Sequence, residues 1–189
     1  MLNIVIFGPP GAGKGTQSEK LTEKYGLFHI STGDIFRWHM STNTDLGKKV
    51  KEIIERGELV PDSITISMLK EEVEKNPSAK GFLFDGFPRT VDQAKALDDL
   101  MESLGTKIGG VLELEVTQEE VKKRIAKRQE EQGRKDDASD KLERRIDEYF
   151  NKTIHVLPYY KEQDKVVTVN GIGGIDDIAS DISQAVDSF

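Results

Sequence analysis

Gly8-Pro9-Pro10-Gly11-Ala12-Gly13-Lys14-Gly15-Thr16 is the stretch of sequence that decides the fold. An apolar run (residues 2–7) precedes it, and a segment with helical periodicity (residues 14–25) follows it. A glycine-rich turn with a lysine, placed between a buried strand and a helix, is typical of a loop that binds phosphate. The glycines let backbone N–H groups point inward, and the helix N-terminus adds partial positive charge. A glycine-rich turn that binds nothing is the alternative, and the lysine argues against it.

Two side chains of this loop carry the expected chemistry. Lys14 can reach the β- and γ-phosphates of a nucleoside triphosphate, and the hydroxyl of Thr16 lies at the helix start. The general pattern has Ser or Thr directly after the lysine, whereas Gly15 intervenes here. We therefore predict no direct protein ligand for Mg²⁺. The ion is expected to be held by nucleotide phosphates and by water near Asp85 and Thr16.

A second motif, Phe82-Leu83-Phe84-Asp85-Gly86-Phe87-Pro88-Arg89, ends another apolar run in a carboxylate. In a parallel sheet Asp85 would lie beside the phosphate loop, where it can hold Mg²⁺ through water. Gly86 and Pro88 turn the chain and present Arg89 at the carboxyl edge of the sheet, where ligands of open α/β sheets bind. A lone Asp at a strand end is ordinarily only a turn residue.

Apolar runs alternate with amphipathic segments along the whole chain. This alternation predicts an α/β protein: a P-loop NTPase-like three-layer fold with a five-stranded parallel sheet flanked by helices. We expect one domain, residues 1–189, with two excursions at residues 31–61 and 127–137. The expected strands are residues 2–7, 28–30, 82–84, 111–116 and 166–169, and the expected helices are 14–25, 32–40, 46–56, 63–75, 90–103, 117–131, 141–161 and 176–186.

Composition limits the class of protein. The 189 residues include no cysteine, which excludes disulfides and thiolate metal sites, so we expect no zinc. We read no secretory signal and no apolar run long enough to cross a bilayer, so we expect a cytoplasmic protein without a membrane partner. The net charge of -7 argues against nucleic acid as a partner. Nothing in the charged helices favours more than a monomer.

The charge is unevenly distributed. Residues 122–145 contain ten Lys or Arg and six Asp or Glu, a local excess of four positive charges. A basic segment on an acidic protein indicates a small, highly charged anion as ligand. The alternative is a solvated helix with ion pairs between successive turns.

Four segments together resemble adenylate kinase: residues 8–17 (GPPGAGKGTQ), 30–37 (ISTGDIFR), 57–62 (GELVPD) and 85–90 (DGFPRT). The likeness extends over nearly the whole chain, and Gly15 matches this family's form of the loop. The resemblance implies reversible phosphoryl transfer from ATP to AMP with Mg²⁺, giving two ADP. The chain differs from the larger members of this family in its lid, because only five residues separate Arg128 from Arg134. We therefore expect residues 127–137 to form a short lid loop.

The resemblance also assigns the candidate site residues. For catalysis it implies Lys14, Asp85, Arg89, Arg128, Arg134 and Arg145. For ATP binding it implies Gly11, Ala12, Gly13, Lys14, Gly15, Thr16, Arg124, Arg128 and Gly173. For AMP binding it implies Thr32, Arg37, Glu58, Leu59, Val60, Gly86, Phe87, Pro88, Arg89, Gln93, Arg134 and Arg145.

Several of these residues have a purely structural alternative. Gln93 could only cap its own helix, Thr32 could be a helix cap, and Arg37 could be solvated. The lid loop could be a mere turn flanked by surface arginines. The three histidines have no ligand spacing, and we interpret them as structural or surface residues.

Two other functions remain open at this point. A pyrimidine (UMP or CMP) monophosphate kinase would share the phosphate loop and Arg89, although that family has Ala where this chain has Thr32. A non-catalytic nucleotide sensor could use the same fold, because fold alone does not determine function.

Overall fold

The computed structural model describes residues 1–132 and 139–189, and the side chains of residues 1–127 and 143–189. Within these ranges, five strands form one sheet in the order β2-β3-β1-β4-β5, and every neighbouring pair is parallel. The predicted five-stranded parallel sheet is confirmed. The strands are β1 (Ile4–Phe7), β2 (Phe28–Ser31), β3 (Phe82–Asp85), β4 (Gly110–Glu115) and β5 (Val166–Asn170).

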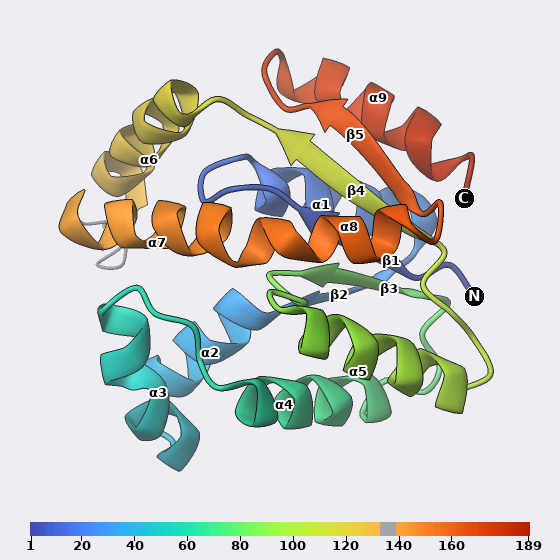
Figure 1. Cartoon of the computed structure of the whole chain (residues 1–189), viewed down its shortest axis with the longest axis horizontal. Coiled ribbons are helices and arrows are strands. Elements are labelled where there is room, and N and C mark those ends of the chain that lie inside the picture. Colours follow the sequence, from blue (N-terminus) through green and yellow to red (C-terminus); the bar gives the residue numbers. More distant parts are fainter. Residues whose placement is uncertain (133–138) are drawn as a thin grey trace.

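Helices surround the sheet, as Figure 1 shows. They are α1 (Lys14–Tyr25), α2 (Thr32–Ser41), α3 (Asp45–Glu55), α4 (Asp62–Glu74), α5 (Val91–Ser103), α6 (Gln118–Gln132), α7 (Ser139–Asn151), the 3₁₀ helix η2 (Thr153–His155), α8 (Val156–Lys161) and α9 (Ile175–Val186).

The prediction of one continuous helix over residues 141–161 is wrong. The chain leaves the α conformation at Lys152 (φ −128°, ψ −59°), passes through η2 and begins again as α8. Pro158 contributes to this break because it has no N–H to donate to the carbonyl of Ile154, as a continuous helix would require. The two helices still run on in nearly the same direction in Figure 1.

Alternate residues of the central strand enter two separate hydrophobic clusters. Ile4 and Ile6 belong to the cluster that contains side chains of α1, α6 and α9. Val5 and Phe7 belong to the cluster that contains side chains of α4, α5 and α8. Because all four side chains are at most 3% exposed, the sheet is covered on both faces. This confirms the three-layer α/β architecture.

A third, smaller cluster joins the excursion after β2 to helix α4. It joins Phe36 of α2, Val50 of α3, Val60 of the following loop and Met68 of α4. Figure 1 shows α2 and α3 extending away from the sheet on the side of α4. The excursion thus has apolar packing of its own.

The register of the strands sets the position of the candidate site. Asp85 at the end of β3 lies opposite Ile6 of β1 and opposite Ser31 of β2. The phosphate loop leaves β1 at this same carboxyl edge. The strands β3 and β4 lie on opposite sides of β1, so the chain crosses β1 when it passes from β3 to β4. Such a switch point is where open α/β sheets form ligand crevices.

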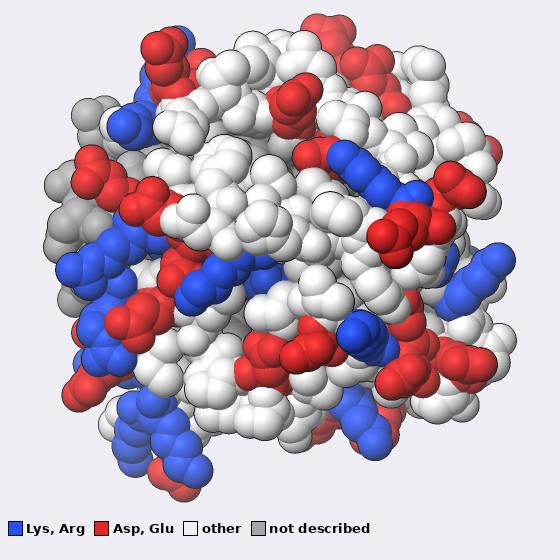
Figure 2. All heavy atoms as spheres, in the orientation of Figure 1, with Lys and Arg blue, Asp and Glu red and all other residues white. Residues whose placement is uncertain are grey.

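Acidic and basic side chains are interspersed on the described part of the face in Figure 2. A mixed face differs from the continuous basic surface with which proteins bind nucleic-acid backbones. Among the helices of residues 1–132 and 139–189, none combines the length and apolar character needed to cross a bilayer.

Candidate active site

The phosphate loop (residues 8–16) is fixed by glycine conformation and by close packing. Gly11 and Gly13 have φ values of +81° and +95°, in the left-handed region that favours glycine. A Cβ atom on Gly11 would lie 2.7 Å from Cγ1 of Ile125 in α6. The N–H of Ala12 donates to the carbonyl of Pro9 (3.1 Å), which closes the turn before α1 begins. Substitution at Gly11 would therefore meet both backbone strain and a clash.

Lys14 opens α1 and folds back over this loop. Its Nζ donates to the carbonyl oxygens of Gly8 (2.8 Å) and Pro9 (3.2 Å). The ammonium group is thus held between the end of β1 and the start of the helix. A triphosphate on the loop would meet a positive charge that the loop itself already positions.

Asp85 provides the carboxylate of this edge. Burial alone would raise the pKa of Asp85, but the approach of His29 and the charges of Lys14 and Arg89 outweigh it and lower that pKa. The His29 Nε2 atom lies 3.8 Å from Oδ2 of Asp85, which is too long for a hydrogen bond. Asp85 is therefore ionised at neutral pH, as a carboxylate that faces Mg²⁺ must be. His29 was interpreted as structural, and its position against Asp85 was missed.

The turn after β3 brings three predicted residues together. Gly86 has φ +79°, and its carbonyl accepts hydrogen bonds from Nε of Arg89 (2.7 Å) and from the hydroxyl of Thr32 (2.9 Å). The N-cap of α2 is Ser31, whose hydroxyl accepts from the N–H of Asp34 (3.3 Å). Thr32 is therefore not the helix cap, and its hydroxyl instead joins α2 to the Gly86 turn.

Arg89 is held in a place that disfavours its charge. Burial, together with the positive charge of Arg145, lowers the pKa of Arg89 to about 10. Arg37 also contributes repulsion, while Asp85 offsets part of it. Three guanidinium groups from α2, the β3–α5 turn and α7 thus converge. Such an arrangement is favourable only when an anion lies among them.

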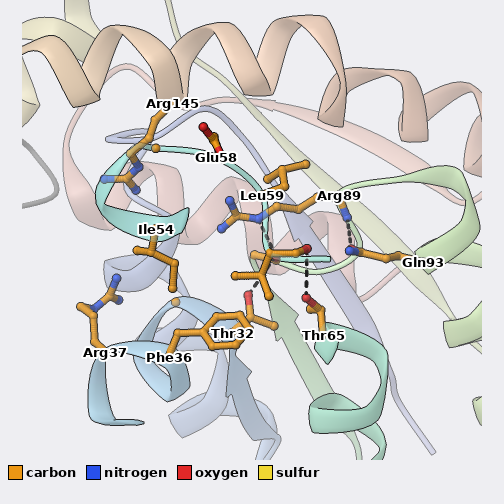
Figure 3. A pocket seen from close by; sticks show the side chains of 14 residues that line it. Thr32, Phe36, Arg37, Ile54, Glu58, Leu59, Thr65, Arg89, Gln93 and Arg145 are labelled. Carbon is orange, nitrogen blue, oxygen red and sulfur yellow. Dashed lines mark hydrogen bonds between the residues drawn. The ribbon is translucent and has the colours of Figure 1, made fainter. Parts of the chain in front are cut away.

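Two cavities meet at this cluster of arginines. The first, the α2–α4 cavity, is drawn in Figure 3 and is lined by Thr32, Gly33, Phe36, Arg37, Ile54, Gly57, Glu58, Leu59, Val60, Thr65, Gly86, Arg89, Gln93 and Arg145. The second, the phosphate-loop cavity, is lined by Ile6, Phe7, Gly8, Pro10, Lys14, Gly57, Leu59, Gly86, Phe87, Pro88, Arg89, Arg145, Glu148, Tyr149 and Thr153.

A common wall separates the two cavities. It consists of Gly57, Leu59, Gly86, Arg89 and Arg145. Two arginines can therefore face a ligand in either cavity.

Of the eleven predicted AMP-binding residues that the structure describes, nine line the α2–α4 cavity and two do not. Phe87 and Pro88 line the phosphate-loop cavity instead, and the peptide bond between them is cis. Glu58 lines the α2–α4 cavity while its carboxylate accepts from Nε and Nη2 of Arg56 (2.9 and 3.1 Å). Arg37 forms an ion pair with Asp34 one turn earlier and also lines this cavity, so it is not simply solvated.

Gln93 lines the α2–α4 cavity, and the N-cap of its helix α5 is Thr90. The side-chain Oε1 of Gln93 accepts from the backbone N–H of Arg89 (2.8 Å), and its backbone N–H donates to the hydroxyl of Thr90 (3.1 Å). The side chain is only 2% exposed. Gln93 therefore does not cap its helix, because its side chain bonds to Arg89, which precedes the N-cap, and to Asp62 of α4.

The remaining predicted ATP-binding residues lie in different places relative to the phosphate loop. Arg124 donates to Glu120 (2.7 Å) and to the carbonyl of Ala12 (3.2 Å), so it docks α6 on the phosphate loop. Gly173 lies exposed after β5 and lines neither cavity. The Arg128 side chain and the whole of Arg134 lie outside the described residues, as do residues 133–137 of the predicted lid loop, whereas residues 127–132 belong to α6.

Sequence reasoning missed several side chains of the α2–α4 cavity. Phe36, Ile54 and Thr65 line it, although they look like core positions of amphipathic helices. Phe36 lies in the quoted segment 30–37 but was given no role, and Ile54 and Thr65 lie in no quoted segment. Asp62, which bonds to Gln93 (2.8 Å), was quoted as part of a motif but given no role.

Comparisons with known proteins agree with this geometry. Residues 6–165 match the family model described as "Adenylate kinase". The chain is 47% identical over 190 residues to adenylate kinase of Flavobacterium johnsoniae, and 48% identical over 190 residues to that of Flavobacterium psychrophilum, with all of each chain covered. It is 44% identical over 186 residues to adenylate kinase of Maricaulis maris, covering 98% of this chain and 99% of the relative.

Proposed function

The chain belongs to the adenylate kinase family, and on this basis we propose that it acts as an adenylate kinase. The reaction is the reversible, Mg²⁺-dependent transfer of the γ-phosphoryl group of ATP to AMP, which gives two ADP. The activity makes the protein a nucleoside monophosphate kinase that balances the adenine nucleotides.

One observation carries this proposal: Arg89 and Arg145 stand in the wall that the two cavities share. Phosphoryl transfer between two nucleotides requires that the phosphates of both lie next to each other, with positive charge between and around them. A single nucleotide-binding pocket would need no second cavity lined by the same arginines. The shared wall is the feature expected of a site for two phosphorylated substrates.

The chemistry needs charge compensation more than proton transfer. An oxygen of the AMP phosphate attacks the γ-phosphorus of ATP while the bond from that phosphorus to the β-bridging oxygen breaks. The attacking phosphate has a second pKa near 6, so it is largely ionised at neutral pH without a general base. Unit charges 4 Å apart repel by about 4 kcal/mol at an effective dielectric of 20. Lys14, Arg89 and Arg145 supply the opposing charge.

We assign ATP to the phosphate-loop cavity and AMP to the α2–α4 cavity. Lys14 and the loop glycines support the first assignment, because they form the helix-start geometry that suits a triphosphate. Arg37 supports the second assignment, because it lines only the α2–α4 cavity. Arg124, which donates to the carbonyl of Ala12 in the phosphate loop, also supports the first assignment.

Mg²⁺ fits the carboxyl edge of the sheet. Asp85 has a lowered pKa and lies near Lys14, so an anionic oxygen is available beside the triphosphate loop. Among the described residues no three His, Asp or Glu side chains gather into a protein cage. Magnesium in kinases is typically held by one or two carboxylates together with substrate phosphates and water. When bound, it would neutralise charge on the phosphates.

Two excursions are proposed to close over the substrates. Residues 31–61 would form the AMP-binding excursion, which the separate apolar cluster around Phe36 and Val50 supports. Residues 127–137 would form a short lid that brings Arg128 and Arg134 to the phosphates. Closure is required because water beside the γ-phosphate would turn transfer into hydrolysis. We further propose that the enzyme acts as a monomer in the cytoplasm.

The test is to incubate the protein with Mg·ATP and AMP, UMP or CMP in turn, and to measure ADP formation. ADP formed with AMP and not with the pyrimidine nucleotides supports the proposal. Faster turnover of UMP or CMP would instead indicate a pyrimidine monophosphate kinase. Binding of ATP and AMP without turnover would indicate a nucleotide sensor and would contradict the proposal.

A further inference from the structure

The Gln93 amide has two fixed partners in the wall of the α2–α4 cavity. Its Oε1 accepts from the backbone N–H of Arg89 (2.8 Å), and its Nε2 donates to Oδ1 of Asp62 (2.8 Å). A backbone N–H can only donate, and an ionised carboxylate can only accept. If the amide were turned over, its NH₂ group would face the N–H donor of Arg89, and its oxygen would face the acceptor oxygen of Asp62. The sense of the amide is therefore set by these two partners together.

Asp62 is itself held in place by the same helix start. Its Oδ2 accepts from the hydroxyl of Thr90 (2.7 Å), and that hydroxyl accepts from the N–H of Gln93 (3.1 Å). Because Asp62 opens α4 while Thr90 and Gln93 belong to the start of α5, the carboxylate joins two helices. Both of its oxygens are committed to the residues that orient Gln93.

Gln93 lies at the end of the cavity away from two of the arginines. In Figure 3, Arg37 and Arg145 lie on one side, while Thr65 and Gln93 lie on the other. If the phosphate of the acceptor lies among the arginines, its base lies toward Gln93. A primary amide offers two donor and two acceptor positions, and the bonds to Arg89 and Asp62 occupy one of each. One N–H and one lone pair can then face the base.

The sense of the amide decides which purine edge it can match. Adenine presents a 6-amino donor beside the N1 acceptor, whereas a 6-oxo purine presents an acceptor beside an N1–H donor. An amide held in one sense pairs with only one of these edges, because the opposite edge sets donor against donor. A freely turning amide would accept both.

Resting on the proposed function, we propose that Asp62 is a positioning residue for purine selection. It holds the NH₂ end of Gln93 toward itself, supported by Thr90, and so fixes the donor–acceptor order that the acceptor base meets. The residue does not touch the reacting phosphates. Its contribution is discrimination between 6-amino and 6-oxo purine monophosphates.

The experiment compares AMP with inosine 5′-monophosphate (IMP), which differ at this edge, as acceptors for Mg·ATP. In Asp62→Asn the side chain keeps its shape but presents an NH₂ group to one of its two donors. The sense of the Gln93 amide is then set by the N–H of Arg89 alone, and we expect the ratio of kcat/KM for AMP over IMP to fall about tenfold. The matched control is Asp92→Asn, which makes the same change at an exposed position in the first turn of α5. This control should keep the wild-type ratio.

Thr90 supplies a second pair of variants, which remain informative if Asp62→Asn does not fold. Thr90→Val removes the hydroxyl that supports Asp62 while keeping the shape, and it should lower the AMP over IMP ratio. Thr90→Ser keeps the hydroxyl and should keep the ratio. Reduced stability with an unchanged ratio in Asp62→Asn and Thr90→Val would overturn the inference and leave Asp62 as a tie between helices. Failure of the wild-type protein to phosphorylate AMP would overturn the proposed function as well.

Discussion

The phosphate loop and the α2–α4 cavity differ in how the chain builds them. The loop is one run of nine residues, and its form depends on glycine backbone angles and on Lys14 bonding to Gly8 and Pro9. The α2–α4 cavity takes its lining from α2, α3, α4, α5 and α7, and its form depends on side-chain bonds between these elements.

This difference predicts two kinds of sensitivity. A change in the phosphate loop should act directly on the nucleotide that we propose lies there, because the loop is one local turn. A change in the α2–α4 cavity acts through partners, because Gln93 and Thr32 are held by groups from other elements. Variants of the first kind should affect catalysis, and variants of the second kind should also affect base selection and stability.

The largest effect is expected for Lys14→Met. This variant removes the positive charge of Lys14 that would lie beside the transferring phosphate. Turnover should fall a hundredfold or more, which corresponds to about 3 kcal/mol of lost transition-state stabilisation. Lys20→Met, on the exposed side of the same helix, is the matched control and should keep its activity. Steady-state kinetics on both folded variants measures the contrast. Wild-type turnover in Lys14→Met would remove the loop from the mechanism.

The variants Arg89→Ala and Arg37→Ala compare a residue of the shared wall with a residue that lines one cavity alone. Arg89 lines both cavities, so its loss should lower kcat by about a hundredfold. Arg37 lines only the α2–α4 cavity, so its loss should raise KM for AMP by about tenfold while ATP affinity stays the same. The two KM values are measured with the other substrate saturating. An equal loss of ATP affinity in Arg37→Ala would contradict the assignment of the cavities.

Gly86→Ala tests how far the second region depends on its turn. The residue has φ +79°, and an added Cβ would lie 2.8 Å from the hydroxyl oxygen of Thr32. We expect a loss of about 1–3 kcal/mol in the free energy of unfolding and weaker AMP binding. Gly105→Ala is the matched control, with φ +68° and no atom within 4 Å of the added Cβ. If Gly105→Ala lost as much free energy of unfolding, the effect of Gly86→Ala would be due to backbone strain alone.

The smallest effect is expected outside both regions, at the ion pair between Lys20 and Asp176 (2.8 Å). The hydrogen bond from Lys20 lowers the pKa of Asp176. Since the folded pKa lies below the unfolded one, the pair contributes stability above about pH 4 and loses it as the pH falls through the folded pKa. Asp176→Asn should therefore lower Tm slightly at pH 7 and not at pH 2, without changing activity. Thermal unfolding at the two pH values measures this, and a larger Tm difference at pH 2 would contradict it.

The same difference between the regions explains what the sequence could predict. The five strands and the phosphate loop were predictable because apolar runs and glycine spacing are local signals. The contact between His29 and Asp85 was not, because it depends on β2 pairing with β3 in the sheet. The bond from Gln93 to Asp62 depends likewise on α4 packing against α5. The break before α8 was not predicted, because the apolar pattern of residues 141–161 continues through Pro158.

The central claim is that two nucleotides meet at the wall formed by Arg89 and Arg145, and that the phosphoryl group passes directly between them. The most direct test follows the label of [γ-³²P]ATP with and without AMP in a single turnover. The account predicts label in the β-phosphate of newly formed ADP only when AMP is present, and no label on the protein. Labelled protein, or rapid release of labelled phosphate that AMP does not redirect, would contradict direct transfer at the shared wall.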